Sequence, residues 1–554
     1  MEASERIDGL HTTASPCGRL IAYILPGSPR VRISHTHSPQ HCTEFNSRIL
    51  IKDILNLKWS ADSSRLAILS SRLVDVLDLD DVNRRIRLDN GSGGLGSFRS
   101  ADFIGTDTLL TVWEFGNARI WNLHTGKCVD LPDAKTFTTM PAWQVRPNAA
   151  KGLPPMLAML SRQSGEDTLA MQFVGTQAAS NFATKVPGDN RTISWSPDGR
   201  WLALNGAPYT SPCLHIYTAD GHHFKSFDGH DRSVDHAPNR KQEDKLGLIG
   251  VKEVVWSPNS QILALSRYDG RLSLLNTRTF GSLADIEHFT AINQSNLAVE
   301  DQAPIYEESV AASGERSYIR VAHPFMPPRS EIKDRQGVND QGVAEMKFSC
   351  DGSYLATRDA RMQSTVWIWS VATLSARAVL IQHTNVRKLH WHRTDSEVLM
   401  IDCGEGIASI YHVSASESPQ PQHLSLPGNV SLSWIPLSAD VKPAILASTR
   451  STFRVLYPEG RDDNFEIHGA RQEPVDAGAS FEEGASEDSL MEMLSGRKPL
   501  PPLPNDSYTR RIDMEVEEED EYDTSARLDD TFRGKRKENF GSIEIDPLDD
   551  SQIF

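Results

Sequence analysis

A short phrase repeats along the first 460 residues of this chain and constrains its fold more than any other feature. Each clear copy has an aromatic residue, a serine, a turn rich in Pro, Asp or Gly, and then a strand-like run containing Leu-Ala. The clear copies begin at Trp59, Trp195, Trp256 and Phe348, and weaker copies begin at Trp391 and Trp434. Such a repeat predicts one small structural unit per copy, with the six aromatic residues as buried anchors between neighbouring units.

The copies are spaced as in WD40 blades, which repeat every ~40–45 residues. Trp391 follows Phe348 by 43 residues, and Trp434 follows Trp391 by the same interval. Between copies, short runs alternate between apolar and polar residues and are punctuated by hairpin signals such as Tyr268-Asp-Gly270. Helical periodicity is nearly absent. The sequence therefore predicts an all-β fold, a WD40-type β-propeller over residues 1–460; the alternatives are an array of β-sandwiches or an irregular all-β protein.

The number of blades is left open by this pattern. Further anchors at Ser15, near residues 98–103 and at Trp143 bring the total to nine, which slightly exceeds the roughly four to eight blades of a common ring. We therefore expect seven to nine blades, in one ring or in two smaller rings. Longer gaps between copies predict inserted polar loops near residues 222–246 and 293–337.

The last part of the chain, residues 461–554, differs in composition. It carries 26 acidic and 11 basic residues, whereas the body before it is nearly neutral. Low hydrophobicity with high charge predicts a disordered acidic tail. Within it, a cation is followed by a PxxP pattern at Lys498, Pro501 and Pro504. A polyproline II segment of this kind can dock into an SH3-type groove, although a stiff spacer is the alternative.

Several classes of protein are excluded by simple counts. The six cysteines are scattered without a CxxC pair, which predicts no disulfide framework, no thiolate zinc site and a reducing compartment. No apolar run approaches the ~20 residues of a membrane helix, and Met1–Gly9 lacks the apolar stretch of a signal peptide. The near-neutral body does not favour nucleic acid. We expect no membrane and no nucleic-acid partner.

Motifs for catalysis or cofactor binding are weak. Gly91–Gly96 matches GxGxxG, but a strand-like segment follows where a dinucleotide site needs a helix, so we interpret it as a turn between blades. Histidines cluster at residues 35–41 and 222–230 without carboxylate or cysteine ligands at familiar spacings. No hydrolase or kinase motif is present. We expect a protein that is not an enzyme and that carries no metal or cofactor.

Two segments carry a more specific resemblance. One is Gly250–Ala264 (GVKEVVWSPNSQILA), continuing through Tyr268-Asp-Gly270 to Asn293; the other runs from Phe348 through Leu355-Ala-Thr-Arg358 and Val366-Trp-Ile-Trp369 to Trp391. Their order and spacing resemble the WD repeat-containing protein 8 family of centrosomes and spindle poles. The resemblance covers residues 15–457 in architecture and is specific over 250–391. The Trp-Asp dipeptide itself is missing, so we do not expect the buried Asp–His network that often joins WD40 blades.

The resemblance implies a role in microtubule organisation. Members of that family bind a coiled-coil microtubule-anchoring protein and act with a minus-end-directed kinesin and γ-tubulin-containing pole components. We therefore expect a protein-binding scaffold of the cytoplasm and cytoskeleton that holds microtubule minus ends at the spindle pole body or centrosome during mitosis. Two other classes stay open: a propeller scaffold for RNA processing or translation initiation, and an enzyme that uses the central channel.

Overall fold

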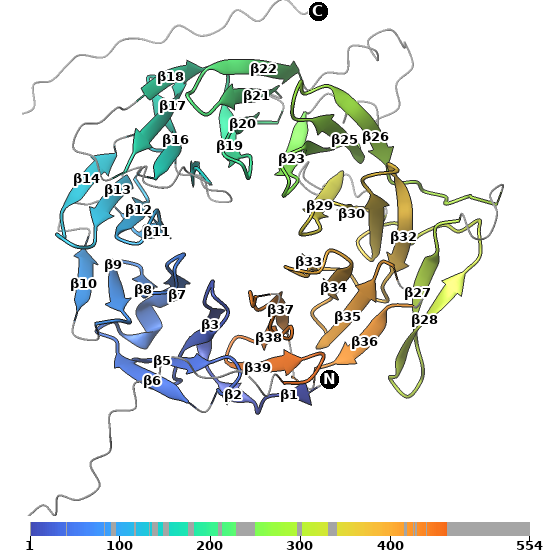
Figure 1. Cartoon of the computed structure of the whole chain (residues 1–554), viewed down its shortest axis with the longest axis horizontal. Coiled ribbons are helices and arrows are strands. Elements are labelled where there is room, and N and C mark those ends of the chain that lie inside the picture. The colour runs from blue at the N-terminus through green and yellow to red at the C-terminus, as the bar shows by residue number, and fades with distance from the viewer. Residues whose placement is uncertain are drawn as a thin grey trace, which may run out of the picture. The chain divides into compact units, whose positions relative to one another are not determined.

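The computed structural model shows a ring of β-sheets (Figure 1). It describes residues 2–461, except 40, 82–83, 90–95, 116–117, 132, 136–141, 148–154, 175–181, 209–212, 229–249, 296–301, 331–340, 415–417, 425, 427–428 and 439, and does not describe residues 462–554. The regular structure of the described residues consists of strands and one short 3-10 helix, η1 (Ile51–Asp53). The all-β prediction is therefore confirmed.

Within the described ranges, the strands form nine sheets in succession, called blades 1 to 9, and Figure 1 shows the first strand of each nearest the centre. Blades 1 to 3 consist of β3 (Leu10–Ala14), β4 (Leu20–Ile24), β5 (Arg30–His35), β6 (Cys42–Asn46); β7 (Ile54–Trp59), β8 (Arg65–Ser70), β9 (Leu73–Asp78), β10 (Arg85–Asp89); β11 (Phe98–Phe103), β12 (Thr108–Trp113), β13 (Ala118–Asn122) and β14 (Cys128–Leu131). Neighbouring strands within each of these blades are antiparallel.

Blades 4 to 6 repeat the same arrangement. They consist of β15 (Trp143–Val145), β16 (Met156–Gln163), β17 (Glu166–Phe173), β18 (Phe182–Val186); β19 (Asn190–Trp195), β20 (Trp201–Gly206), β21 (Cys213–Thr218), β22 (His223–Asp228); β23 (Val251–Trp256), β24 (Ile262–Arg267), β25 (Arg271–Asn276) and β26 (Ser282–Glu287). Strand β22 is the outermost strand of blade 5. The segment near 222–246, predicted as an inserted loop, therefore begins with a strand of the ring, and residues 229–249 lie outside the described residues.

Blades 7 to 9 complete the ring, and blade 7 carries two additional strands. They consist of β29 (Val343–Phe348), β30 (Tyr354–Asp359), β31 (Thr365–Ser370), β32 (Ser375–Ile381), with the additional β27 (Ile305–Val310) and β28 (Arg316–Val321); β33 (Lys388–Trp391), β34 (Val398–Asp402), β35 (Ile407–His412), β36 (Gln420–His423); β37 (Ser431–Trp434), β38 (Ile445–Ser448) and β39 (Thr452–Tyr457).

Blade 9 is built from both ends of the described chain. Its three C-terminal strands are completed by β1 (Glu2–Ala3), which pairs antiparallel with β39 so that Glu2 lies opposite Tyr457. The short strand β2 (Ile7–Asp8) also pairs with β39. The carbonyl of Val455 accepts a hydrogen bond of 2.8 Å from the backbone N–H of Ser4. The ring is therefore closed by strand pairing.

The apolar core lies between the blades rather than at the centre of the ring. Nine clusters of buried residues fill the nine junctions of neighbouring blades, one cluster per junction. At the junction of blade 9 and blade 1, the rings of Tyr23 and Phe453 are 4.9 Å apart. A continuous series of junctions means one ring of nine blades, at the upper end of the predicted range. Of the two arrangements left open by the sequence, the structure has the single ring.

The recurring phrase folds into a hydrogen-bonded turn after the first strand of a blade. In blade 5, the Ser196 hydroxyl donates to Asp198 Oδ1 at 2.6 Å and accepts from the Trp201 N–H at 2.9 Å. Gly199 has a φ of +68°, and a Cβ there would lie 2.4 Å from the Pro147 carbonyl oxygen. This position therefore excludes other residues. The same serine contacts recur at Ser60, Ser257 and Ser349.

Blades 6 and 7 are joined by a buried polar network that the sequence did not lead us to expect. The Trp369 indole N–H donates to Thr357 Oγ1 at 2.8 Å, and His288 Nε2 lies 2.8 Å from the same hydroxyl. Burial lowers the pKa of His288, so its imidazole is neutral and can accept from Thr357. The Asp359 side chain is also buried beside this histidine. Because Trp369 is followed by a serine rather than an aspartate, the missing Trp-Asp dipeptide concealed this Trp–Thr–His network.

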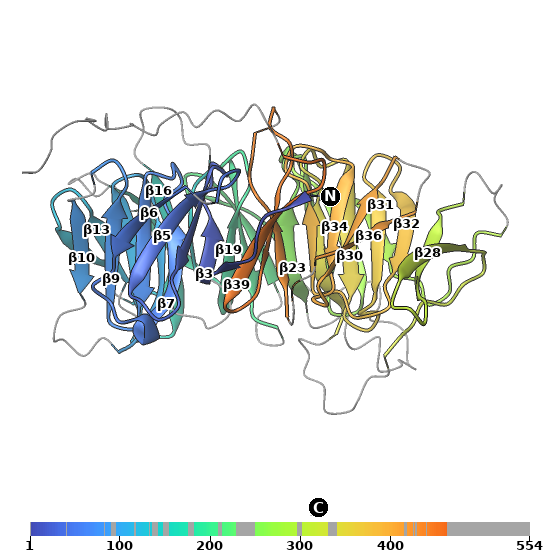
Figure 2. The same cartoon turned by 90° about the horizontal axis from the view of Figure 1, so that it is seen from below.

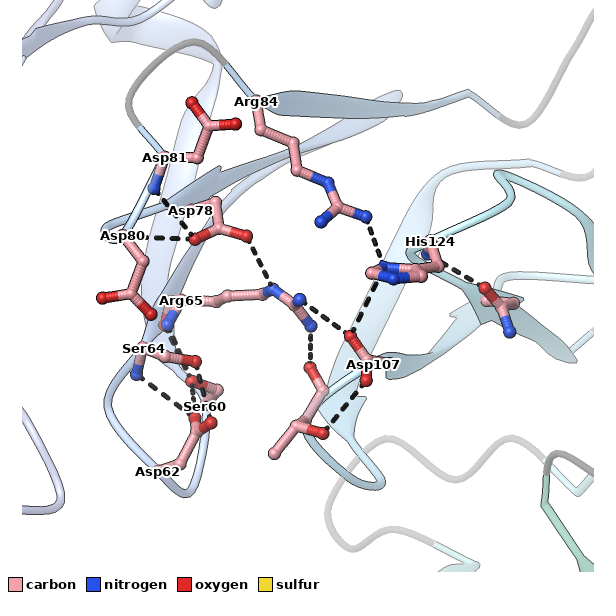
Figure 3. A network of polar contacts seen from close by, with 12 residues as sticks. Ser60, Asp62, Ser64, Arg65, Asp78, Asp80, Asp81, Arg84, Asp107 and His124 are labelled. Atoms are coloured by element: carbon pink, nitrogen blue, oxygen red, sulfur yellow. Dashed lines mark hydrogen bonds and ion pairs between the residues drawn. The ribbon is translucent and has the colours of Figure 1, made fainter.

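Blades 2 and 3 are joined by a different network, centred on a buried arginine (Figure 3). Arg65 Nε lies 3.4 Å from Asp78 of its own blade, and Nη2 lies 2.7 Å from Asp107 of blade 3. The guanidinium also donates to the Thr106 carbonyl. The hydrogen bond from Arg65 is the main cause that lowers the pKa of Asp107. The charged carboxylate of Asp107 therefore keeps the buried guanidinium paired across the junction.

Candidate protein-interaction surface

The six predicted anchor residues lie at the ends of innermost strands, where each is buried. Five of them are tryptophans whose indole N–H donates to a backbone carbonyl of the preceding blade. The donor–acceptor distances are 3.3 Å for Trp59 to Thr13, 3.3 Å for Trp195 to Gln144, 3.3 Å for Trp256 to Ser194, 2.8 Å for Trp391 to Lys347 and 3.0 Å for Trp434 to His390. Phe348 packs in the junction of blades 6 and 7. These residues stabilise the ring, and the candidate functional residues lie at other positions.

The potential metal ligands are scattered over the described ranges of the chain. Among those residues, no group of three or more His, Cys, Asp or Glu side chains is placed to hold a metal ion. The described chain also has no helix long and apolar enough to cross a membrane. Since binding residues concentrate in loops and insertions on a regular scaffold, the place where the structure departs from its own repeat is the candidate site.

The largest departure is a hairpin inserted between blades 6 and 7. Strands β27 and β28 extend blade 7 into a sheet with the order β28-β27-β32-β31-β30-β29. Strand β27 pairs parallel with the outermost strand of the blade, and Ile305 lies opposite Val379. Figures 1 and 2 show the hairpin projecting from the outer wall of the ring. The predicted insertion near 293–337 thus contains an ordered hairpin that widens one blade, while residues 296–301 and 331–340 lie outside the description.

One face of the hairpin packs on blade 8. The Tyr318 hydroxyl lies 2.6 Å from Gln382 Oε1 and 2.8 Å from Ser409 Oγ. Burial is the main cause that raises the pKa of this phenol, so it stays protonated and can donate. Arg316 forms ion pairs with Glu308, at 3.1 Å, and with Glu405 of blade 8. These contacts hold the hairpin in one orientation across the junction of blades 7 and 8.

Apolar side chains on and beside the hairpin are open to solvent. Ile319 on β28 is 57% exposed, Phe289 is 53% exposed and Met326 is 76% exposed. The segments that carry Phe289 and Met326 are joined by the isolated bridge between Ile292 and Phe325. Exposed apolar residues on a structurally fixed insertion are typical of a protein-binding surface. We call the hairpin β27–β28 together with Phe289 and Met326 the blade 7 extension.

The base of the blade 7 extension contains a cavity of about 370 Å³. It is lined by Ser295, Gln302, Arg320, Val321, Ala322 and His323. His323 Nε2 lies 3.0 Å from the Ala303 carbonyl oxygen, which orients the ring. Arg320 is exposed at the cavity edge. The extension therefore combines a cationic side chain with neighbouring apolar surface.

These residues were not among the predicted ones, because the polar composition of the insertion favours a loop. A signal was present: Ser313-Gly314 is a turn pair between two six-residue segments that carry Ile305, Val310, Ile319 and Val321. Charged residues within both segments hide this pattern. The predicted SH3-type ligand residues Lys498, Pro501 and Pro504 lie outside the described residues, as does the predicted acidic tail apart from Arg461.

Known proteins similar to this chain share the repeat architecture. No protein-family model matches the chain. An uncharacterised WD repeat-containing protein of Schizosaccharomyces pombe is 25% identical over 405 residues, covering 70% of this chain and 75% of the relative. The WD repeat-containing protein WRAP73 of Mus musculus is 26% identical over 368 residues, covering 62% of this chain and 72% of the relative. The relatives are WD repeat proteins.

Solved structures are similar to this chain only at a coarse level. The crystal structure of a eukaryotic initiation factor has a TM-score of 0.48 at 10% identity, covering 75% of this chain and 88% of that chain. The C-terminal WD40 domain of Sif2 has a TM-score of 0.42 at 10% identity, covering 82% and 98%. The nine-bladed ring rests on the strand order of the chain itself.

Proposed function

We propose that this protein is a non-catalytic scaffold that binds an elongated coiled-coil protein and anchors microtubule minus ends at the spindle pole or centrosome. The observation that carries the proposal is the position of residues 250–391. This segment has the specific family resemblance, and it forms blades 6 and 7, the first strand of blade 8 and the blade 7 extension. The most family-like sequence and the largest departure from the ring repeat therefore coincide.

The architecture suits a scaffold for a physical reason. Nine packed junctions hold the ring rigid, so a surface on its rim keeps a fixed orientation toward its partner. The blade 7 extension stands outside the ring wall, where a long partner can reach it (Figure 2). We propose that a minus-end-directed kinesin and γ-tubulin-containing components join this assembly.

Imaging of dividing cells tests the proposal. The endogenously tagged protein is expected to form foci that coincide with a γ-tubulin marker, and its purification is expected to recover a coiled-coil pole protein. Diffuse signal would contradict the proposal, and signal that follows ribosomes would favour the translation-initiation alternative.

A matched pair of substitutions then tests the surface. Ile319 on β28 and Val129 on β14 are 57% and 56% exposed, and each lies on the outermost strand of its sheet. We expect Ile319→Asp to abolish the foci at the spindle poles and Val129→Asp to leave these foci unchanged. Equal behaviour of the two variants would show that the blade 7 extension is not the partner site.

A further inference from the structure

We propose that β28 binds an extended segment of a partner as a seventh strand of blade 7, and that this segment alternates apolar and acidic residues. The inference rests on the proposed role as a protein-binding scaffold and gives that role a recognition chemistry. Three properties of β28 support it: its unpaired backbone edge, the different side chains on its two faces, and its charge.

The backbone edge follows from the hairpin register. The Ala311 N–H donates to the Glu315 carbonyl at 2.8 Å, next to the pair Val310–Arg316. Hydrogen-bonded and non-hydrogen-bonded pairs alternate along an antiparallel ladder. The backbone N–H and C=O groups of Arg316, Tyr318 and Arg320 therefore point away from β27. Since β28 is the last strand in the sheet order, this edge can accept another strand.

The side chains of β28 divide between two faces, because successive residues of a strand point to opposite sides. Tyr318 and Arg316 turn toward blade 8, where their polar contacts lie. Arg320 follows them at the same two-residue interval. Among the described residues no ion pair includes Arg320, whereas Arg316 has two carboxylate partners. On the opposite face, Ile319 is 57% exposed.

These properties select the occupant by complementarity. A strand beside β28 places an acidic residue next to Arg320 and apolar residues beside Ile319, which favours an alternating apolar and acidic segment. A second copy of this chain fits poorly, since antiparallel pairing of two β28 strands about Tyr318 places Arg316 opposite Arg320. Strand β36 of blade 8 is a weaker template because Pro421 lacks a backbone N–H.

Synthetic peptides test the inference on the full-length protein. The probes are fluorescently labelled peptides of about ten residues, one alternating valine with glutamate and the other alternating valine with lysine. In anisotropy titrations we expect the glutamate peptide to bind about tenfold more tightly, because a cross-strand pair of opposite charges replaces one of like charges. Absence of binding by the glutamate peptide, or equal binding of both peptides, would overturn the inference.

Three variants locate the binding edge. Arg320→Glu is expected to reverse the preference between the peptides, and Arg320→Pro to abolish both, since proline removes an outward N–H while the ladder to β27 stays intact. Arg329→Glu makes the same charge change on the same insertion and is expected to keep the wild-type preference. An unchanged melting temperature confirms that each variant is folded. Binding that survives Arg320→Pro would place the peptides elsewhere and contradict strand addition.

Three further outcomes overturn this inference or separate it from the proposed function. If the peptides fail while the tagged protein still recovers its coiled-coil partner at the poles, the scaffold role stands and strand addition is wrong. If light scattering shows a dimer that Arg320→Pro dissociates, the edge binds a second copy, and the peptide inference is overturned. If the peptides bind but the tagged protein forms no foci at the spindle poles, the binding site on β28 is supported and the spindle-pole role is contradicted.

Discussion

Blade 7 contains two regions that use similar residues for opposite purposes. In its four ring strands, Leu355, Trp367 and Val379 are buried against blade 6. In the added hairpin, Ile319 is more than half exposed, and the face toward blade 8 is held by polar contacts of Tyr318 and Arg316. The difference shows that the repeat encodes stability, whereas the departure from it provides surface for contacts.

The largest effect is expected at a ring anchor. Trp256→Ala removes a buried indole and its hydrogen bond to the Ser194 carbonyl, which is expected to lower the free energy of unfolding by about 3–5 kcal/mol. Chemical denaturation measures this change, with Ile319→Ala as the control that barely alters it. Equal stability of the two variants would contradict the view that buried ring residues provide stability and exposed residues of the extension do not.

A second large effect depends on pH and concerns only the ring. Burial, with Lys388 and Lys347 nearby, lowers the pKa of His390 to about 4, below its ordinary value in the unfolded chain. The unfolded chain therefore binds this proton first as pH falls, and stability is lost between about pH 6.5 and 4, by at most about 3 kcal/mol. We expect His390→Gln to flatten this part of the stability profile. If the stability of the His390→Gln variant changes with pH in parallel with that of the wild type, the loss of stability at low pH does not come from His390.

Disrupting the buried network between blades 6 and 7 is expected to lower the free energy of unfolding by a smaller amount. Thr357→Val keeps the side-chain shape but leaves the Trp369 indole N–H and His288 without their shared hydroxyl. We expect a loss of about 1–3 kcal/mol in the free energy of unfolding, the cost of unsatisfied buried polar groups. Thr357→Ser, which keeps the hydroxyl, is the matched control, and its stability in thermal melts should lie nearer the wild type.

The contacts of the hairpin with blade 8 are expected to contribute less. Tyr318→Phe removes the hydroxyl that contacts Gln382 and Ser409, which is expected to cost about 1 kcal/mol. Because the hairpin lies outside the ring junctions, we expect faster hydrogen exchange in β27 and β28 and unchanged exchange in β29–β31. Faster exchange throughout blade 7 would show that the extension also supports the ring.

The smallest change in stability is expected where the largest change in binding is expected. Ile319→Ser alters an exposed side chain, so the free energy of unfolding should change by less than about 0.5 kcal/mol. Its recruitment to spindle poles should nevertheless fall, as scored by foci beside γ-tubulin. Retained foci would assign partner binding to a surface other than the blade 7 extension.

The sequence predicts what is local and repeated. Trp256 and Ser257 carry the anchor and the turn in adjacent positions, and these recur often enough to predict the fold and most blades. The closure of the ring depends on β1 pairing with β39, which no local pattern encodes. The role of Thr357 depends on His288 from another blade. The pairing of β27 with β32 joins two strands that have four other strands between them in the sequence.

The shared ninth blade has a consequence for how the protein is made on the ribosome. Strand β1 precedes every other described strand in the sequence, whereas its partner β39 is the last of them. During translation the blades that have already formed make an open arc, whose first and last blades do not yet pack together. Each apolar junction can form once its second blade has been synthesised, but the ring can close only after β39, which ends at Tyr457, is available to pair with β1. Premature termination within blade 9 would therefore leave an open arc in which the apolar residues that pack between blade 9 and blade 1 are exposed.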